Sequence, residues 1–225
     1  MRIGGLQKFS LLDYPDKVCC IIFTRGCDFR CPYCFNPELV DPHQYGTLIS
    51  EEEVWDFLEN RKKILEAVVI SGGEPTLQPN LISFIQKVKQ LGYLVKLNTN
   101  GSKPHILRRL IFLKAIDYIA MDVKAPLNDY AMASGVMIDP DIIRQSINII
   151  IKSGIRYEFR VTVAKSLCSE DDLKEIKELL RQAETIRLQK AVLDSKILDK
   201  SLSAEQQYTD EEFEKLKHAF EQGAV

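Results

Sequence analysis

The sequence lacks long apolar runs and carries almost no excess of charge of either sign. Its longest apolar stretches, residues 18–23 and 147–151, are far shorter than the roughly 20 residues that a membrane-spanning helix needs. The 30 lysines and arginines stand against 32 aspartates and glutamates, so the net charge indicates neither nucleic acid nor an anionic membrane as a partner. The chain does not open with a basic region followed by an apolar run, which argues against a secretory signal. We therefore expect a soluble, cytoplasmic protein.

Internal repeats and low-complexity segments are also missing from the sequence. Its 225 residues, 45% of them hydrophobic, are enough to bury a substantial core in one domain. We expect a single domain over residues 1–225, with its core at about residues 17–193 and a polar segment with a helix at residues 194–225. The serine-rich stretch 194–208 is interpreted as an excursion or flexible linker before the last helix.

Three of the six cysteines lie close together in the sequence. The spacing of Cys27, Cys31 and Cys34 allows one short loop to bring three sulfurs to a single centre. Soft thiolates suit zinc, copper(I) and iron–sulfur clusters, and a cluster of four irons normally takes four cysteines. This stretch contains only three cysteines, which would leave one iron of such a cluster without a protein ligand. An open coordination position is typical of a metal site that performs chemistry, because structural sites are closed.

Two other interpretations of these thiols are a zinc knuckle with His43 as the fourth ligand and disulfide bonds. Tetrahedral zinc sites normally pair two C-x2-C or H-x3-H units, and nothing in the sequence points to an oxidising compartment. Of the other cysteines, Cys19 and Cys20 sit in an apolar run of strand length, where cysteine acts as a small hydrophobe. Cys168 begins a polar loop, and we expect it to be inert as well.

Short β-branched and aromatic runs alternate with amphipathic segments along the chain. Strands are expected at residues 17–24, 67–71, 93–98, 118–123, 156–164 and 186–193. Helices are expected at about residues 50–64, 80–91, 104–111, 140–153 and 170–182, and from residue 209 onward. This alternation predicts right-handed βαβ units and a parallel sheet. Periodicity alone does not separate an open doubly wound sheet from an incomplete barrel.

Polar and glycine-rich motifs follow the predicted strands at their carboxyl ends, where the sites of parallel α/β folds collect. In chain order these motifs are the cysteine triplet, Gly72-Gly73-Glu74-Pro75, Asn98-Thr99-Asn100-Gly101, Asp122 with Lys124, and Arg160. Paired glycines allow the backbone to approach a ligand closely, and Arg160 offers a planar fork that suits a carboxylate. Charges scattered over a solvated face would not align in this way, so the pattern predicts one site.

The C-x3-C-x2-C spacing, with the aromatic Tyr33 before the last cysteine, resembles the radical S-adenosylmethionine superfamily. The stretches at residues 5–15, 23–27 and 31–37 resemble the small activating proteins of anaerobic ribonucleoside-triphosphate reductase. These proteins are relatives of the pyruvate formate-lyase activating enzyme. The resemblance extends from the N-terminus to about Lys165.

This resemblance implies a fold, a set of cofactors and a set of site residues. The fold would be a partial (β/α)6 TIM-like barrel with parallel strands, open on one side. A [4Fe–4S] cluster would be held by Cys27, Cys31 and Cys34, and S-adenosyl-L-methionine would chelate the fourth iron. The cofactor-binding residues that it implies are Tyr33, Gly72, Gly73, Glu74, Asn100, Lys124 and Arg160. Tyr33 would lie beside the adenine, residues 72–74 would hold the amine, and Asn100 and Lys124 are candidates for the ribose and the carboxylate.

The resemblance also implies a monovalent cation, with Thr99 and Asp122 as candidate ligands beside the backbone near Ala120. In the activating enzymes this threonine usually follows an aspartate, whereas Asn98 precedes it here. A neutral amide can still supply an oxygen to a cation. A second departure is Phe35, where relatives often carry histidine; because this position flanks the cluster, we expect it to alter solvent exposure and potential more than assembly.

The implied reaction is reductive cleavage of S-adenosylmethionine, in which the protein binds, orients and excludes water. In the activating subfamily the resulting 5′-deoxyadenosyl radical takes a hydrogen from a glycine of a large enzyme. The expected partners are a glycyl-radical enzyme and a flavodoxin- or ferredoxin-type electron donor, with no nucleic acid and no membrane. Two alternatives stay open: a radical enzyme acting on a small molecule, like the 7-carboxy-7-deazaguanine synthases, and a non-catalytic iron–sulfur or zinc-binding module. The run at residues 11–15 favours the activating enzyme.

Overall fold

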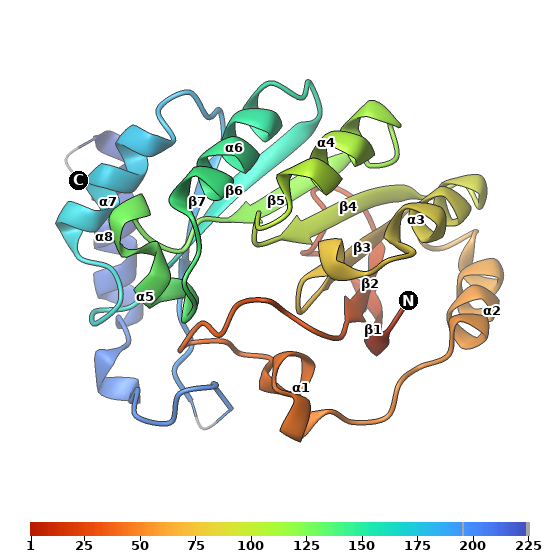
Figure 1. The fold of residues 1–225 in the computed structure, drawn as a ribbon, viewed down its shortest axis with the longest axis horizontal. Coiled ribbons are helices and arrows are strands. Elements are labelled where there is room, and N and C mark those ends of the chain that lie inside the picture. Colours follow the sequence, from red (N-terminus) through yellow and green to blue (C-terminus); the bar gives the residue numbers. More distant parts are fainter. Residues whose placement is uncertain (195, 224–225) are drawn as a thin grey trace.

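The computed structural model describes residues 1–194 and 196–223. Within these residues, seven strands form one sheet in which they lie in chain order (Figure 1). The strands are β1 (Ile3–Ser10), β2 (Cys19–Thr24), β3 (Ala67–Gly72), β4 (Leu94–Thr99), β5 (Tyr118–Asp122), β6 (Arg156–Val163) and β7 (Ile186–Lys190). Strands β2 to β7 are mutually parallel, and β1 pairs with β2 in the antiparallel sense.

The strand order decides between the two architectures that the sequence left open. In a doubly wound sheet the order reverses at a switch point. Here it never reverses, so successive right-handed crossovers run in one direction and curve the sheet toward a barrel. The partial barrel of six parallel strands is therefore confirmed, with β1 as an added edge strand.

The helices lie along the chain between the strands, and Figure 1 shows α3, α4 and α6 side by side over one face of the sheet. The helices are α1 (Pro37–Val40), α2 (Glu51–Arg61), α3 (Leu81–Gln90), α4 (Pro104–Phe112), α5 (Tyr130–Ser134), α6 (Pro140–Ile151), α7 (Glu170–Leu179) and α8 (Asp210–Gln222). Short 3-10 turns are η1 (Pro42–Gln44), η2 (Pro75–Leu77), η3 (Leu127–Asp129) and η4 (Ala204–Gln206). The predicted starts of α2 and α8 are confirmed. Ser50 Oγ accepts a hydrogen bond from Glu53 N, and Thr209 and Glu212 form a complete capping box.

The sequence did not predict β1, α1 or α5. β1 contains two glycines, and its pairing with β2 shifts register between Ile3 and Gly5 and again between Gln7 and Ser10. Each shift of this kind breaks the alternation of inward and outward side chains, which is the pattern that identifies a strand in a sequence. α1 and α5 span four and five residues, which is too short for a helical period to show.

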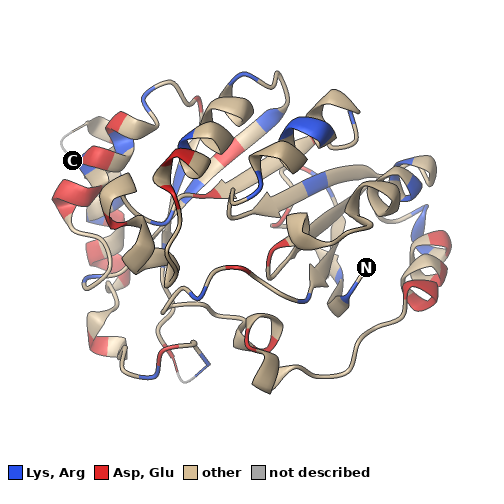
Figure 2. Ribbon diagram, viewed as in Figure 1, with Lys and Arg blue, Asp and Glu red and all other residues tan. Residues whose placement is uncertain are grey.

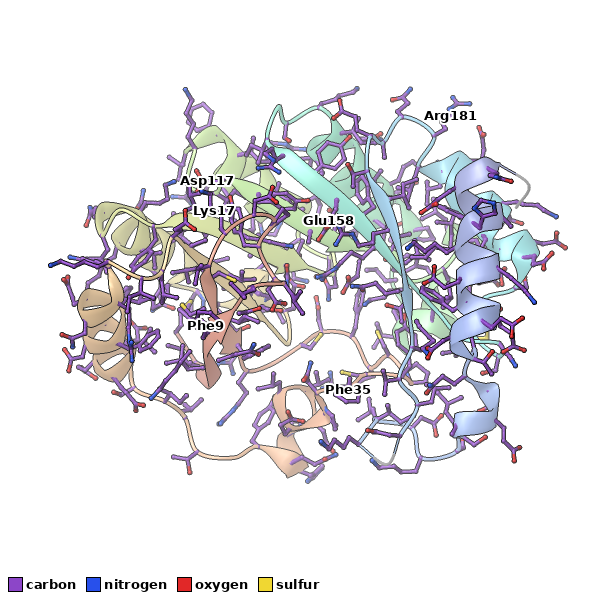
Figure 3. All side chains as sticks on the ribbon, turned by 180° about the vertical axis from the view of Figure 1, so that it is seen from behind. Phe9, Lys17, Phe35, Asp117, Glu158 and Arg181 are labelled. Atoms are coloured by element: carbon purple, nitrogen blue, oxygen red, sulfur yellow. The ribbon has the colours of Figure 1, made fainter. Side chains whose placement is uncertain are left out.

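The two faces of the sheet differ in chemistry. On the face covered by helices, Val68 and Ile70 of β3 belong to the main core cluster together with Phe84 of α3. On the other face, Lys96 of β4 and Glu158 of β6 form a buried ion pair with 2.9 Å between Nζ and Oε1. Figure 3 shows Glu158 near the middle of the sheet, seen from the opposite side to Figure 1. Charged groups therefore reach into the interior of the partial barrel.

Charge on the outside of the molecule is mixed. Figure 2 shows lysine and arginine distributed over strands and helices throughout the fold, with acidic residues gathered at the start of α2. In the described ranges, every helix is too short or too polar to cross a membrane.

Candidate active site

The three clustered cysteines lie in the loop that follows β2, at the carboxyl end of the strand. Cys27, Cys31 and Cys34 are free thiols, and all three line one cavity. Cys34 N donates to Cys31 O at 2.9 Å, so the last two cysteines share a tight turn. Three thiols of one loop at one cavity are a donor set that fits an iron–sulfur cluster with one iron left open.

Backbone contacts hold the cysteine loop from two sides. Glu74 N donates to Gly26 O at 2.8 Å, and a Cβ on Gly73 would lie 2.2 Å from the same oxygen. Gly135 ends α5 with a φ of 68°, and a Cβ there would lie 2.1 Å from Arg30 O. A side chain at either glycine would collide with the backbone of the cysteine loop and push the loop away.

The segment after β7 folds back onto the cysteine loop. Leu198 N donates to Cys34 O at 3.1 Å, and Asp199 N donates to Pro32 O at 2.9 Å. Ile197 beside them is fully buried. Residues 197–199 are therefore packed against the loop, which corrects the flexible-linker alternative and agrees with an excursion of the chain. Residues 195, 224 and 225 of the predicted C-terminal part lie outside the described residues.

The cavity has a volume of about 400 Å³ and opens at the carboxyl ends of the parallel strands. This size lies within the roughly 300–1,000 Å³ typical of small-molecule sites. The predicted site residues that line it are Cys27, Cys31, Tyr33, Cys34, Gly72, Gly73, Thr99, Asn100, Asp122, Lys124 and Arg160. The strand-end motifs thus meet at one place, as the sequence pattern predicted.

Part of the cavity wall was not predicted. The additional lining residues include Phe29, Asn36, Ser71, Thr162, Gln189, Lys190, Ala191 and Val192. The last four continue the strand-end rule to β7, so the same signal applies to them. They were missed because the predicted strand extended to residue 193, whereas β7 ends at Lys190. Phe35 also lines the cavity and is 44% exposed (Figure 3).

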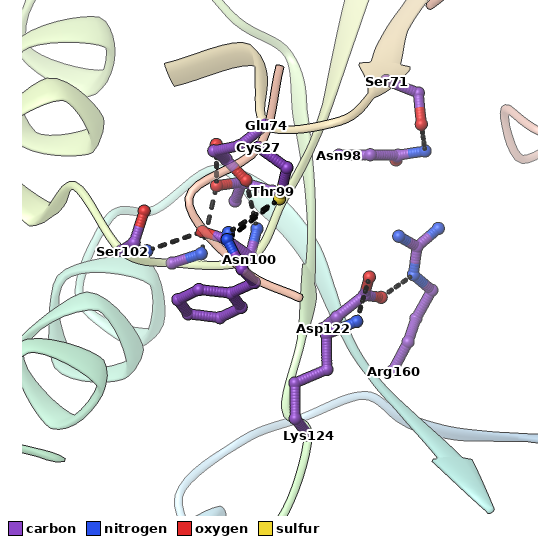
Figure 4. Close-up of polar contacts among 12 residues, drawn as sticks. Cys27, Ser71, Glu74, Asn98, Thr99, Asn100, Ser102, Asp122, Lys124 and Arg160 are labelled. Atoms are coloured by element: carbon purple, nitrogen blue, oxygen red, sulfur yellow. Dashed lines mark hydrogen bonds and ion pairs between the residues drawn. The ribbon is translucent and has the colours of Figure 1, made fainter. Parts of the chain in front are cut away.

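Glu74 lies outside the cavity lining, and its carboxylate binds other parts of the protein (Figure 4). Oε1 accepts from Thr76 N at 3.0 Å and from Thr99 Oγ1 at 2.8 Å, and Oε2 accepts from Asn100 N at 2.6 Å. Burial raises the pKa of this carboxyl, although the hydrogen bonds from Thr76, Asn100 and Thr99 oppose the rise. Glu74 therefore ties the turn after β3 to the turn after β4; its predicted contact with the cofactor amine stays a prediction.

Asp122 forms an ion-pair network with two cations at the cavity wall. Its Oδ1 accepts from Arg160 Nε at 2.8 Å, and its Oδ2 accepts from Lys124 Nζ at 3.0 Å. Burial alone would raise the pKa of Asp122, but Arg160 and Lys124 outweigh this effect and lower the pKa to about 2. Burial likewise lowers the pKa of Lys124, yet Asp122 raises it well above its usual value. All three groups are therefore charged at neutral pH, and their sum is one positive charge.

Tyr33 lies between the cysteines and Lys124. Its ring centroid is 5.8 Å from Lys124 Nζ, and its hydroxyl is buried without a hydrogen-bond partner in the described part of the chain. Burial raises the pKa of this phenol, so it stays protonated. A neutral aromatic ring at the cavity suits stacking against a heterocycle; its place beside an adenine stays a prediction.

Asn100 contacts the cysteine loop directly. Its Nδ2 donates to Asp28 Oδ1 at 3.0 Å and lies 3.8 Å from Cys27 Sγ, and its Oδ1 accepts from Ser102 N. The amide is thus held in one orientation with an N–H directed at the thiol of Cys27. Hydrogen bonds to the sulfurs are among the factors that set the potential of an iron–sulfur cluster.

We expect Asn100→Leu to make the reduction potential of the reconstituted cluster more negative. The substitution removes a donor that stabilises the extra negative charge of the reduced state. A redox titration followed by electron paramagnetic resonance, without S-adenosylmethionine, measures the shift. Asn148→Leu on α6, outside the cavity lining, is the control. Equal potentials for the Asn100 variant and the wild type would show that this hydrogen bond has no influence on the cluster.

The thiols themselves are protonated until a metal displaces their protons. Burial raises the pKa of Cys27 to about 12 and that of Cys31 to about 11, and iron binding must release these protons. The remaining thiols, Cys19, Cys20 and Cys168, are buried away from the cavity lining, as expected for core cysteines. The fourth ligand of the zinc interpretation, His43, is exposed in η1 and lies outside the cavity lining.

Residues 21–183 match the family model of the radical SAM superfamily. A protein of Methanocaldococcus jannaschii named as a glycyl-radical enzyme activating enzyme is 34% identical over 195 residues, covering 83% of this chain and 78% of that protein. A 7-carboxy-7-deazaguanine synthase of Methanothermobacter thermautotrophicus is 31% identical over 156 residues, covering 63% of this chain and 60% of that protein.

The fold also resembles a solved structure. A domain of pyruvate-formate lyase-activating enzyme from Bacteroides vulgatus superposes with a TM-score of 0.55 at 17% identity, covering 71% of this chain and 95% of that domain. This likeness concerns the fold, in agreement with the partial barrel. The family match spans most of the chain and includes the cysteine loop and the polar carboxyl ends of β3 to β6. The chain belongs to the radical SAM superfamily.

Proposed function

We propose that this chain reductively cleaves S-adenosyl-L-methionine at a [4Fe–4S] cluster and generates a glycyl radical on a partner, such as an anaerobic ribonucleoside-triphosphate reductase. The observation that carries this proposal is the cavity that three free thiols share with two cations. Cys27, Cys31 and Cys34 form one wall, and Lys124 and Arg160 lie in the same lining. Three protein ligands leave one iron of a four-iron cluster open. The name of the Methanocaldococcus relative supports the glycyl-radical partner.

The side chains of the cavity have separate tasks in this proposal. Lys124 and Arg160 attract the carboxylate of the aminoacyl group through charge-assisted hydrogen bonds. Gly72 and Gly73 would allow close approach of the amine to the backbone, and the ring of Tyr33 would stack on the adenine. A cluster held by Cys27, Cys31 and Cys34 would supply the single electron for reductive cleavage of the sulfonium, which gives methionine and a 5′-deoxyadenosyl radical able to take a hydrogen atom from a glycine Cα. The protein's own part is to bind, orient and exclude water.

The open side of the barrel suits a macromolecular substrate. β1 and β7 are the two edges of the sheet, so the barrel stays open between them. The cavity reaches Gln189 and Val192 at the end of β7, and Val192 is 49% exposed. A glycine-bearing loop of the partner would enter along this edge, and a flavodoxin- or ferredoxin-type protein would deliver the electron. The similarity to a 7-carboxy-7-deazaguanine synthase makes a small-molecule substrate the second candidate.

Anaerobic reconstitution provides the test. After reduction with dithionite, the loaded protein is expected to convert S-adenosylmethionine into equal amounts of 5′-deoxyadenosine and methionine, measured by liquid chromatography. With a candidate glycyl-radical enzyme present, a carbon-centred radical should appear on that partner in electron paramagnetic resonance. Absence of 5′-deoxyadenosine from a protein with a full cluster would refute the cleavage. Cleavage coupled to conversion of a small-molecule substrate, with no radical on any partner, would favour the second candidate.

A further inference from the structure

The candidate ligands of a monovalent cation are already engaged within the protein. Both carboxylate oxygens of Asp122 accept hydrogen bonds from cations, Oδ1 from Arg160 and Oδ2 from Lys124 (Figure 4). The side chains of Lys124 and Arg160 are 12% and 16% exposed, so water screens these pairs only in part. A metal ion at Asp122 would have to displace one of these cations or stand beside both.

The side chains of Thr99 and Asn98 offer few free oxygens to a cation at this place. The hydroxyl of Thr99 donates to Glu74 and accepts from Gly101 N, so its proton and one lone pair are used. Asn98 is neutral and donates to Ser71 Oγ at 3.1 Å. Its Oδ1 is buried and has no hydrogen-bond partner among the described residues. Hard cations bind through several oxygens, usually with carboxylates among them. Among these side chains only Asn98 Oδ1 is an oxygen without a partner; the remaining lone pairs belong to Thr99 and Asp122 oxygens that are already hydrogen-bonded, beside two fixed positive charges.

We propose that this chain binds the carboxylate of S-adenosylmethionine without a monovalent cation, because Arg160 and Lys124 supply the positive charge that the ion would bring. Arg160 contacts Asp122 through Nε, which leaves its terminal nitrogens as a fork that suits a carboxylate. Asp122 acts as a positioning residue that holds both cations at the cavity. The free Oδ1 of Asn98 then accepts a hydrogen bond from the ligand. This inference rests on the S-adenosylmethionine binding of the proposed function and is independent of the radical's target.

The dissociation constant of S-adenosylmethionine, measured by equilibrium dialysis of the reconstituted protein, tests the proposal. KCl, NaCl and choline chloride are compared at equal ionic strength, so that screening is constant. We expect the constant to change by less than about twofold, since no ion enters the charge balance at the site. Radiolabelled rubidium, as a surrogate for K⁺, should not be retained by the wild type. A marked weakening in choline chloride, or retention of rubidium, would overturn the proposal.

Substitutions identify the groups that take the place of the ion. Arg160→Gln is expected to weaken binding by roughly tenfold or more, because it removes a charge-assisted contact in a largely buried site. Arg187→Gln is the matched control: Arg187 pairs with Arg160 in the β6–β7 register, is 57% exposed and contacts Glu158 instead of Asp122. It should leave the dissociation constant unchanged in every salt. Equal weakening by both arginine variants would mean that net charge alone matters, against the assignment of Arg160.

The double variant Asn98→Asp, Arg160→Gln completes the test. It adds a carboxylate beside Thr99 and frees Oδ1 of Asp122, so it should bind rubidium and require K⁺ or Na⁺ for tight binding of S-adenosylmethionine. A double variant that is indifferent to these ions would contradict the roles given to Asn98 and Arg160. Failure of the wild type to bind S-adenosylmethionine in any salt would refute the proposed function together with this inference, whereas binding that depends on K⁺ would refute the inference alone.

Discussion

Replacing Cys27, Cys31 or Cys34 by alanine is expected to abolish both the iron–sulfur cluster and the cleavage of S-adenosylmethionine. Each thiol lines the cavity and is one of the three protein ligands that we propose for the cluster. With one of them removed, two protein ligands would remain, far from the four that a four-iron cluster normally takes. Iron content per chain, absorbance of the reconstituted protein and formation of 5′-deoxyadenosine measure the loss, and all three should fall to background.

Cys19→Ala and Cys168→Ala are the matched controls for this experiment. Both remove a buried thiol that lies outside the cavity lining, so they should cost about 1–2 kcal/mol of folding stability and leave the iron content unchanged. Loss of the cluster in Cys168→Ala, or its survival in any of the three loop variants, would show that the ligands are assigned incorrectly.

Glu74→Ala is expected to destabilise the protein strongly even in the absence of any cofactor. The carboxylate is fully buried and accepts hydrogen bonds from Thr76, Thr99 and Asn100. Its removal leaves buried donors without an acceptor, at a cost of about 1–3 kcal/mol for each group. We expect a loss of roughly 3 kcal/mol or more in the free energy of unfolding, and a melting temperature lower by about 6–12 °C, measured by circular dichroism on the apoprotein.

Two further variants test whether the loss of stability comes from the hydrogen bonds of Glu74 or only from the loss of one negative charge. Glu52→Ala removes an exposed carboxylate from α2 and should not change the melting temperature. Glu74→Gln keeps the shape of the side chain but places an amide N–H₂ against other donors, so it should lie between the wild type and Glu74→Ala. A Glu74→Ala protein as stable as the wild type would show that the two turns do not depend on this carboxylate.

The positions of the site motifs could be predicted from the sequence because parallel strands end on one side of a sheet. That rule brought the cysteine loop, Asn100, Asp122 and Arg160 together before any side chain was placed. The direction of each side chain could not be predicted in the same way. Glu74 stands in the middle of the motif, yet it does not line the cavity. Its carboxylate binds Thr76, Thr99 and Asn100 instead, because its direction depends on the backbone of both turns.

Contacts between residues that are far apart in the sequence could not be predicted either. Lys96 and Glu158 are 62 residues apart and meet in the barrel interior, although each stands in a run that reads as an ordinary strand. β1 was missed because its irregular pairing hides the alternation of side chains. The contact between Leu198 and the cysteine loop arises from how the chain returns after β7, which local composition does not encode.

The sequential order of the strands has a consequence for synthesis on the ribosome. Each strand pairs with the one made just before it, so the sheet can grow from one edge to the other while translation continues. The thiols emerge early, whereas the donors to the loop carbonyls of Pro32 and Cys34 are made much later. Leu198 is the 164th residue after Cys34, and its synthesis follows roughly 8–33 s later at typical elongation rates. During that interval the contacts from residues 74 and 134 can already form, but the carbonyls of Pro32 and Cys34 still lack their donors from residues 198 and 199.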